Sequence, residues 1–149
     1  MIARLVAAYV ILAWGLLGGA TAATGADAPA GTILVSKPAA GTVHHALVEG
    51  LKLIDAGDFE GWMAQWCSAK KLCYNKNSRK AVAKYNLPAR KRTAASCLRG
   101  DRDAVLVTRV EGDPARDDAV KIYLQCSEDA MPRPFSLQKE PAGWRFTKI

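Results

Sequence analysis

A helical period of apolar residues marks the chain between residues 41 and 56. Apolar side chains recur there three or four positions apart, which is typical of a helix that buries one face. Thr42 can cap the first turn, because its hydroxyl can accept a hydrogen bond from a free backbone N–H. Gly57 can adopt the left-handed conformation that closes such helices. The pattern therefore predicts one amphipathic helix with both of its ends marked.

Two shorter helices are predicted to follow. Asp58 can cap a helix over residues 59–68, whose apolar side chains again share one face. A third helix is predicted over residues 78–86. We expect it to stop there, because Pro88 has no backbone N–H and its ring clashes with the preceding turn of a helix.

The apolar period changes to two after residue 92. The alternation is clearest over residues 120–127, where apolar and polar side chains take turns. Segments separated by turn residues predict five strands: 93–98, 104–111, 119–127, 134–140 and 143–149. Four strands after the helices is the alternative. This order predicts an α+β domain in which three N-terminal helices pack on one face of an antiparallel sheet of four to five strands.

The N-terminus has the three parts of a secretion signal. Residues 1–4 carry one positive charge, residues 5–20 are uncharged and mainly apolar, and small residues precede a predicted cleavage between Ala22 and Ala23. The apolar run is shorter than the roughly 20 residues that span a bilayer, so no stable membrane span is expected after cleavage. An uncleaved N-terminal anchor is the alternative. The protein is therefore predicted to be exported, to the periplasm or out of the cell.

The segment between the signal peptide and the first helix is rich in Ala, Gly and Pro. Residues 23–38 are therefore predicted to form a flexible leader, in which residues 33–35 are the candidates for attachment to the domain. Residues 39–149 are predicted to form a single domain, since their number suits one hydrophobic core.

Four cysteines lie in the predicted mature chain: Cys67, Cys73, Cys97 and Cys126. An even number in an exported protein indicates disulfides, and three pairings are open. The short spacing favours Cys67 with Cys73, which leaves Cys97 with Cys126 to join two extended segments. Zinc is the competing interpretation, but structural zinc sites use closer pairs, with about two to four residues between the cysteines. Neither a metal nor another cofactor is expected.

Basic residues are concentrated in one segment. The whole chain has a formal net charge of +7, and residues 70–102 contain eleven Lys or Arg and one acid. Such asymmetry can attract anionic partners. The candidate anion-binding residues are Lys80, Lys84, Arg90, Lys91 and Arg92. The alternative is a solvated basic face that only keeps the protein soluble.

Export limits the partners that such a segment can meet. Basic residues with interleaved aromatics such as Tyr74 and Tyr85 suit nucleic acid, but an exported protein does not meet the genome. The expected partners are an anionic envelope component or an acidic protein. Exposed ion pairs are weak and screened by salt, so the binding should be salt-sensitive.

No arrangement of residues indicates catalysis, and no catalytic residue is assigned. Most acids lie in turn segments, where they are solvated or cap backbone groups. The candidates for a ligand pocket are three aromatics: Trp62, Trp66 and Tyr123. Trp62 and Trp66 share a helix face, a pattern that more often belongs to the core. Tyr123 lies in the middle of a strand, on the face opposite its apolar neighbours.

Three motifs resemble those of one known superfamily in their order and spacing. Residues 53–60 (LIDAGDFE) lead from the first helix into a Gly-Asp-Phe turn, and residues 118–124 (DAVKIYL) lead from a charged turn into a strand. Residues 137–146 (LQKEPAGWRF) resemble a closing hairpin. Together they resemble the nuclear transport factor 2-like superfamily, whose fold is shared with ketosteroid isomerases, over residues 41–149. The resemblance implies a curved, cone-like sheet around a pocket that some members use for catalysis and others for binding.

The preferred hypothesis is a secreted or periplasmic, non-enzymatic binding module that contacts an anionic partner through residues 70–102. One alternative is a small isomerase or lyase acting in the cone. Another is an accessory subunit of an envelope or secretion complex; such subunits usually have a longer tail than the four residues that precede the apolar run here. Members of the superfamily often pair through the open sheet face, so the resemblance leaves a homodimer as one alternative for the assembly.

Overall fold

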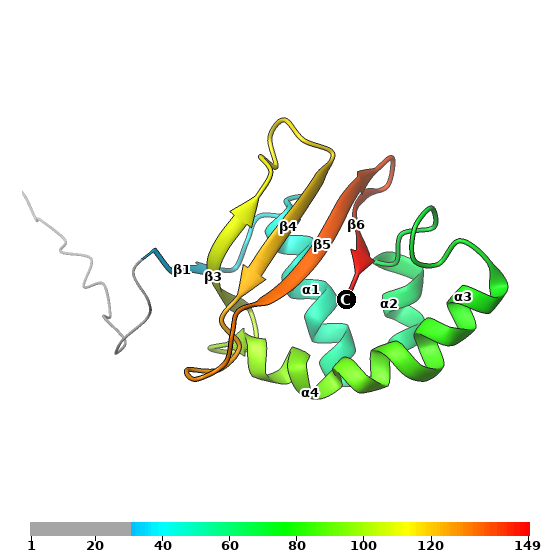
Figure 1. Ribbon diagram of the computed structural model, residues 1–149, viewed down its shortest axis with the longest axis horizontal. Helices are drawn as coiled ribbons and strands as arrows, with labels where there is room; N and C mark the ends of the chain where they lie inside the picture. Colours follow the sequence, from blue (N-terminus) through cyan, green and yellow to red (C-terminus); the bar gives the residue numbers. More distant parts are fainter. Residues whose placement is uncertain (1–30) are drawn as a thin grey trace, which may run out of the picture.

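The structure of the protein, a computed structural model, describes residues 31–149 (Figure 1). The predicted signal peptide, its cleavage site and residues 23–30 of the leader lie outside the described residues. The helices are α1 Val43–Ala56, α2 Phe59–Gln65, α3 Lys76–Ala81, the π-helical turn η1 Val82–Asn86 and α4 Leu87–Cys97. The strands are β1 Ile33–Ser36, β2 Leu98–Arg99, β3 Ala104–Glu111, β4 Ala119–Leu124, β5 Arg133–Glu140 and β6 Gly143–Lys148. The domain is α+β, as predicted.

The strands form one open antiparallel sheet with the order β1-β3-β4-β5-β6, and β2 pairs with the beginning of β3. In Figure 1, α1 lies behind the sheet and the helical run from α3 to α4 passes below it. The sheet has six strands, more than the four to five predicted. The two additional strands are the short ones, β1 and β2.

Strand β1 precedes the helices, so the predicted order of helices first and strands afterwards does not hold. Residues 33–36 lie in the predicted leader, where 33–35 were the candidates for attachment to the domain, and they pair with residues 104–107 of β3. The Lys37 amide continues this pairing by donating to the Asp103 carbonyl at 2.9 Å. Three consecutive β-favouring side chains explain the strand. The strand was not predicted because the residues on either side of it are rich in Gly and Pro, a composition typical of a flexible segment.

Helix α1 forms as predicted, with both of its caps. The Thr42 hydroxyl accepts a hydrogen bond from the His45 amide at 3.1 Å. Gly57 has a φ of 82° and donates its amide back to the last turn, which closes the helix. The buried face includes Leu47, Leu51 and Ile54, each at most 1% exposed.

Helix α2 ends at Gln65, three residues earlier than predicted. The residues after it pair with the last strand instead: the Phe146 amide donates to the Trp66 carbonyl at 2.7 Å, and the Ser68 amide donates to the Phe146 carbonyl at 2.9 Å. These bonds satisfy the exposed edge of β6. They hold residues 66–68 against β6, which stops the helix.

The predicted stop at Pro88 and the predicted strand over residues 93–98 are wrong. Residues 76–97 form one continuous helical run, in which Pro88 lies in the first turn of α4, where a missing N–H is tolerated. The π-helical turn η1 precedes it, and the Leu87 amide donates to the Val82 carbonyl five residues back. A wider turn at this point accommodates the proline that would break a regular helix. The helix therefore continues to Cys97.

Strands β3 to β6 lie where they were predicted, with small changes at their ends. Strand β4 stops at Leu124 rather than at residue 127. Gln125 is buried there, and its side-chain amide donates to backbone carbonyls of the following loop, including that of Ala130 at 2.9 Å. These side-chain hydrogen bonds fix a turn in place of a further ladder.

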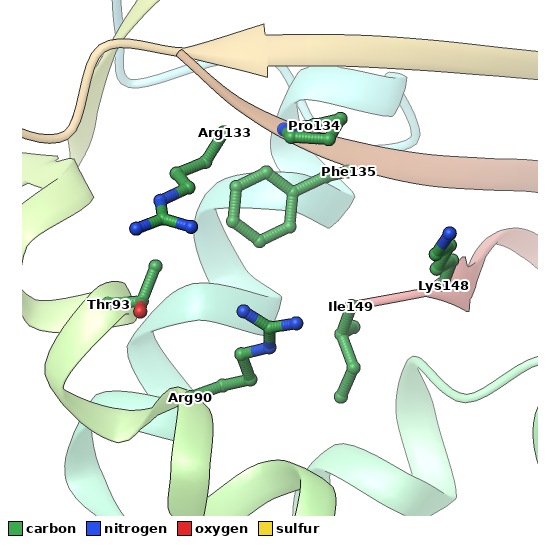
Figure 2. A pocket seen from close by; sticks show the side chains of 7 residues that line it. All are labelled: Arg90, Thr93, Arg133, Pro134, Phe135, Lys148 and Ile149. Atoms are coloured by element: carbon green, nitrogen blue, oxygen red, sulfur yellow. The ribbon is translucent and has the colours of Figure 1, made fainter. Parts of the chain in front are cut away.

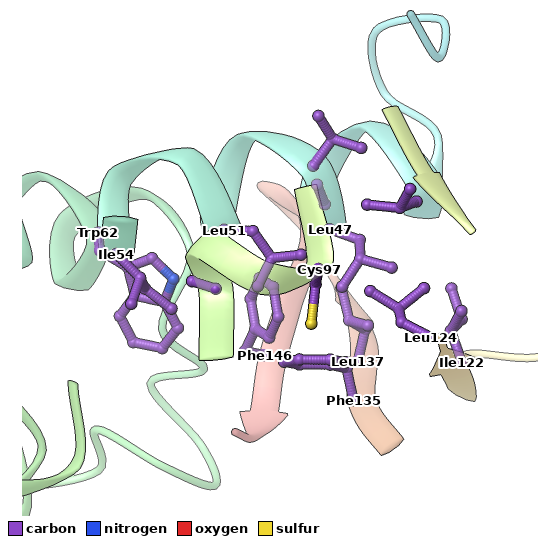
Figure 3. Packing of buried hydrophobic residues seen from close by; sticks show 14 of the residues in the cluster. Leu47, Leu51, Ile54, Trp62, Cys97, Ile122, Leu124, Phe135, Leu137 and Phe146 are labelled. Carbon is purple, nitrogen blue, oxygen red and sulfur yellow. The ribbon is translucent and has the colours of Figure 1, made fainter. Parts of the chain in front are cut away.

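The core lies between α1 and the inner face of the sheet. Figure 3 shows side chains from α1, α2, α4 and three strands interdigitating in this layer. Trp62 and Phe146 are fully buried at its centre, with ring centroids 5.4 Å apart. The space between α1 and the sheet is filled by apolar side chains.

Two disulfides join Cys67 to Cys73 and Cys97 to Cys126, the pairing that the spacing favoured. The second joins the last residue of α4 to the chain just after β4, rather than two extended segments as expected. Both bonds are consistent with an exported protein. Within residues 31–149, no helix has the length and apolar character needed to cross a membrane.

Candidate functional site

The five candidate anion-binding residues all lie on the helical run 76–97. Lys80 belongs to α3, Lys84 to η1, and Arg90, Lys91 and Arg92 to α4. They face different neighbours. Lys80 and Lys84 line a groove against α2, and Lys91 and Arg92 line a second groove beside Pro88. Arg90 alone turns toward the end of the sheet.

Most cations of residues 70–102 have no acidic partner in the described part of the chain. Arg102 forms an ion pair with the buried carboxylate of Asp55, and Arg99 donates to the carbonyls of Gln125 and Cys126 at 3.0 Å. The other nine form no ion pair within residues 31–149: Lys70, Lys71, Lys76, Arg79, Lys80, Lys84, Arg90, Lys91 and Arg92. The positive charge of this surface is therefore largely uncompensated.

Lys91 has a structural explanation that the other candidates lack. Its Nζ lies so close to Gly57 that a Cβ added there would be 3.3 Å from it. Gly57 closes the C-terminus of α1, where free carbonyls favour a nearby cation. Lys91 thus stabilises the end of α1.

A partly enclosed cavity of about 190 Å³ lies between α4 and the end of the sheet (Figure 2). Figure 2 shows Arg90 and Arg133 directing their guanidinium groups into the same space beside the Phe135 ring, with Lys148 at its rim. The lining residues are Arg90, Thr93, Arg133, Pro134, Phe135, Lys148 and Ile149. No acidic side chain lines the cavity, and none of its three cations forms an ion pair with a described residue.

The helical period explains why Arg90 faces inward. The buried residues of α4 are Leu87, Ala94 and Cys97. Arg90 follows Leu87 by three positions and precedes Ala94 by four, so it lies on the same face of the helix. Its side chain is half-buried, while the neighbouring Lys91 and Arg92 are exposed. A cation is therefore placed at a position where the helix otherwise presents apolar residues.

The other two cations come from the β5–β6 hairpin, outside the basic segment. Arg133 begins β5 and Lys148 ends β6. The start of one strand and the end of its antiparallel neighbour lie at the same end of a sheet, and Lys148 pairs with Ser136 in this register. Neither Arg133 nor Lys148 had a predicted role. The predicted hairpin was a signal that could have brought them together.

The three aromatics proposed as a pocket do not come together. Trp62 is fully buried in the core. Trp66 lies at the edge of the core, with its ring centroid 6.1 Å from that of His45. Tyr123 lies on the opposite face of the sheet from the core. The predicted pocket is thus divided between the core, its edge and the outer face.

Tyr123 belongs to a small charged cluster on the outer face of the sheet. Its hydroxyl donates to Glu111 at 2.9 Å, and the Arg109 guanidinium lies 4.0 Å from the ring centroid. Lys121 lies 3.1 Å from the second Glu111 oxygen. Hydrogen bonds from Lys121 and then Tyr123 lower the pKa of Glu111, and the same carboxylate raises the pKa of Lys121. The one carboxylate thus offsets part of the charge of two cations, Arg109 and Lys121.

Residues 31–149 contain no group of three or more His, Cys, Asp or Glu side chains placed to hold a metal ion. All four cysteines are used in disulfides. Comparison of the chain with models of known protein families, with curated proteins and with solved structures finds no match in any of the three. The function has to be argued from the site itself.

Proposed function

We propose that this protein is an exported, non-enzymatic binding module that contacts an anionic component of the cell envelope through the basic surface of its 76–97 helical run. The observation that carries the proposal is the group of nine cations in residues 70–102, those other than Arg99 and Arg102, that form no ion pair within the described residues. Uncompensated cations close together along the chain repel one another and attract a polyanion. An acidic protein is the alternative partner.

The core supports a binding role over an enzymatic one. An isomerase or lyase of the cone type needs an apolar pocket that holds a carboxylate base and hydrogen-bond donors. Trp62, Phe146 and Leu51 occupy that space, and Tyr123 faces away from it. The proposal therefore places the activity on the surface rather than in the interior.

The proposal includes a nuclear transport factor 2-like fold, in which the sheet is curved and cone-like. Register shifts in the pairing of β3 with β4 and of β5 with β6 favour such curvature, because a bulge bends the strand that carries it. Helices packed on one face of an antiparallel sheet fit the same fold. The superfamily supports no particular reaction.

The test measures binding of the purified exported protein to vesicles of phosphatidylglycerol and phosphatidylcholine at low salt. The surface variant is Lys80→Gln, Lys84→Gln and Arg92→Gln. Arg90 and Lys91 are left unchanged, since one faces the cavity and the other lies against Gly57. The matched control is Lys52→Gln, Arg116→Gln and Lys139→Gln, which removes the same charge elsewhere.

The surface variant should bind about 100-fold more weakly than the unmodified protein, because each basic residue near an anionic surface contributes about 1 kcal/mol. The control should lose much less, and binding of the unmodified protein should fall steeply as salt is raised. Equal losses in the two variants would show that net charge alone acts, and the proposal would be abandoned. Vesicles of pure phosphatidylcholine should bind neither variant.

A further inference from the structure

We infer that the cavity between α4 and the end of the β5–β6 hairpin is a binding site for a phosphate group, with Arg90, Arg133 and Lys148 as its cationic ligands. The inference deepens the proposed function and rests on it for the anionic nature of the partner. It adds a defined site and a chemical class to a surface that would otherwise attract any polyanion.

Three cations line one partly enclosed space: Arg90 is half-buried, and Arg133 and Lys148 are exposed at its rim. The two guanidinium groups enter this space from different elements, α4 and β5, so the fold itself brings them together (Figure 2). Neither they nor Lys148 form an ion pair or a side-chain hydrogen bond with another described residue. Repulsion between like charges is stronger in a partly enclosed space than in open solvent. A bound anion removes this repulsion and satisfies the unpaired donors.

The chemistry of the donors favours phosphate over carboxylate. Each guanidinium offers planar, paired N–H groups that match two oxygens of a phosphate. The Thr93 side chain also lines the cavity and carries a hydroxyl that can donate. A phosphate presents three or four oxygens and up to two negative charges to these groups, whereas a carboxylate presents two oxygens and one charge. A phosphate therefore accepts hydrogen bonds from more of the donors in the cavity than a carboxylate does.

The cavity volume and its apolar wall indicate a phosphate ester. A volume of about 190 Å³ is below the range of roughly 300–1,000 Å³ that encloses a whole drug-sized ligand. It has room for a phosphate and the first atoms attached to it. Phe135, Pro134 and Ile149 supply apolar surface on which those carbon atoms can pack. The rest of the ligand would extend out of the cavity into solvent.

Two sources share this chemistry: a phospholipid headgroup and a soluble phosphate ester. The probes are accordingly glycerol 3-phosphate and vesicles containing phosphatidylglycerol, with sodium acetate as the carboxylate comparison. Binding of the small probes is measured by titration calorimetry of the full exported protein. The cavity variants are Arg90→Gln and Arg133→Gln, and the comparison is the surface variant described above, whose three residues do not line the cavity.

We expect saturable binding of glycerol 3-phosphate, stronger than that of acetate. Each cavity variant should weaken it about tenfold or more, since each removes charge-assisted hydrogen bonds. The surface variant should leave it within about twofold. No binding of glycerol 3-phosphate by the unmodified protein, or equal binding by all variants, would overturn the inference. Circular dichroism spectra should agree among the variants, because Arg133 lies exposed at the start of β5 and Arg90 is only half-buried.

The vesicle arm separates the two sources and the two proposals. Weaker vesicle binding by Arg133→Gln supports a lipid headgroup, and unchanged vesicle binding with lost glycerol 3-phosphate binding supports a soluble ester. If the surface variant and its charge-matched control bind vesicles equally while Arg133→Gln loses glycerol 3-phosphate, the proposed surface fails and the cavity stands. The reverse pattern removes the cavity and leaves the surface.

Discussion

Replacing Gly50 by Ala tests whether the interior is as full as the structure indicates. Gly50 lies in the middle of α1 and faces the core. A Cβ at this position would lie 2.9 Å from Cζ of Phe146, closer still to Cε2 of the same ring, and 3.3 Å from Nε1 of Trp62. Both rings are fully buried and packed against each other, so neither can move into solvent.

Two opposing effects set the size of the change. Ala is more favourable than Gly in a helix by about 1 kcal/mol. Overpacking a well-filled core costs about 1–3 kcal/mol, and overlap with two atoms of an enclosed ring places Gly50 in the upper part of that range. The net expectation is a loss of about 1–2 kcal/mol in the free energy of unfolding. For a domain of this size, that corresponds to a lower melting temperature by about 4–8 °C.

Urea and thermal unfolding followed by circular dichroism measure this change. The matched control introduces Gly50→Ala into a Phe146→Leu background, where the shorter side chain removes the overlapping ring atoms. In that background the substitution should be neutral or stabilising by up to about 1 kcal/mol. If Gly50→Ala were as stable as the unmodified protein with Phe146 in place, the interior would have free volume. An interior pocket of the kind that an enzyme needs would then be compatible with the fold.

Three further predictions concern covalent links and charges. Loss of the Cys97–Cys126 bond, with a sequence separation of 29, should lower the free energy of unfolding by about 3.6 kcal/mol on the loop-entropy model, and loss of the Cys67–Cys73 bond, with a separation of 6, by about 2.4 kcal/mol. Urea unfolding of the two double Ala variants measures these losses. The opposite order of the two losses would show that the model fails here. Burial lowers the pKa of His44 below 6.5. As the pH falls, the unfolded chain therefore binds a proton before the folded protein does, and the free energy of unfolding should decrease below about pH 6.5. His44→Gln should reduce that decrease between pH 7 and pH 5, and the same decrease in the variant would contradict the reasoning. Arg102→Gln should lower the free energy of unfolding by about 1–3 kcal/mol, because Asp55 is 8% exposed and would lose its ion-pair partner. The control Lys52→Gln breaks an exposed ion pair with Glu49. It should change the free energy of unfolding by less than about 1 kcal/mol in the same urea assay.

The elements that could be predicted from the sequence carry their own local signals. Helix α1 has a full apolar stripe, a Thr cap and a Gly stop, and each of these works in the structure as expected. The strands β3 to β6 alternate and are separated by turn residues, so only their ends differ from the prediction. The disulfide pairing followed from one short spacing. In all of these, residues close in sequence determine the outcome.

The elements that were missed depend on partners far away in the chain. Strand β1 is only four residues long and exists because β3 offers an edge to it. The early end of α2 depends on β6, which lies about 80 residues later. The cavity shows the same limit. Arg90 was singled out for its charge, whereas Arg133 and Lys148 join it only because the β5–β6 hairpin ends beside α4.

The wrong prediction at Pro88 and the inward direction of Arg90 have one cause. Val82 and Leu87 are both buried although they are five residues apart, a spacing that a regular helix would not place on one face. The π-helical turn between them contains one extra residue, which allows both side chains to face the core. Helix α4 begins at Leu87, so the direction of each later side chain in α4 follows from the buried position of Leu87. A helix that ended at residue 86 would leave Arg90 in a loop, and a helix without the wider turn would rotate Arg90 away from the sheet. The turn that accommodates Pro88 therefore also sets the direction of the Arg90 side chain.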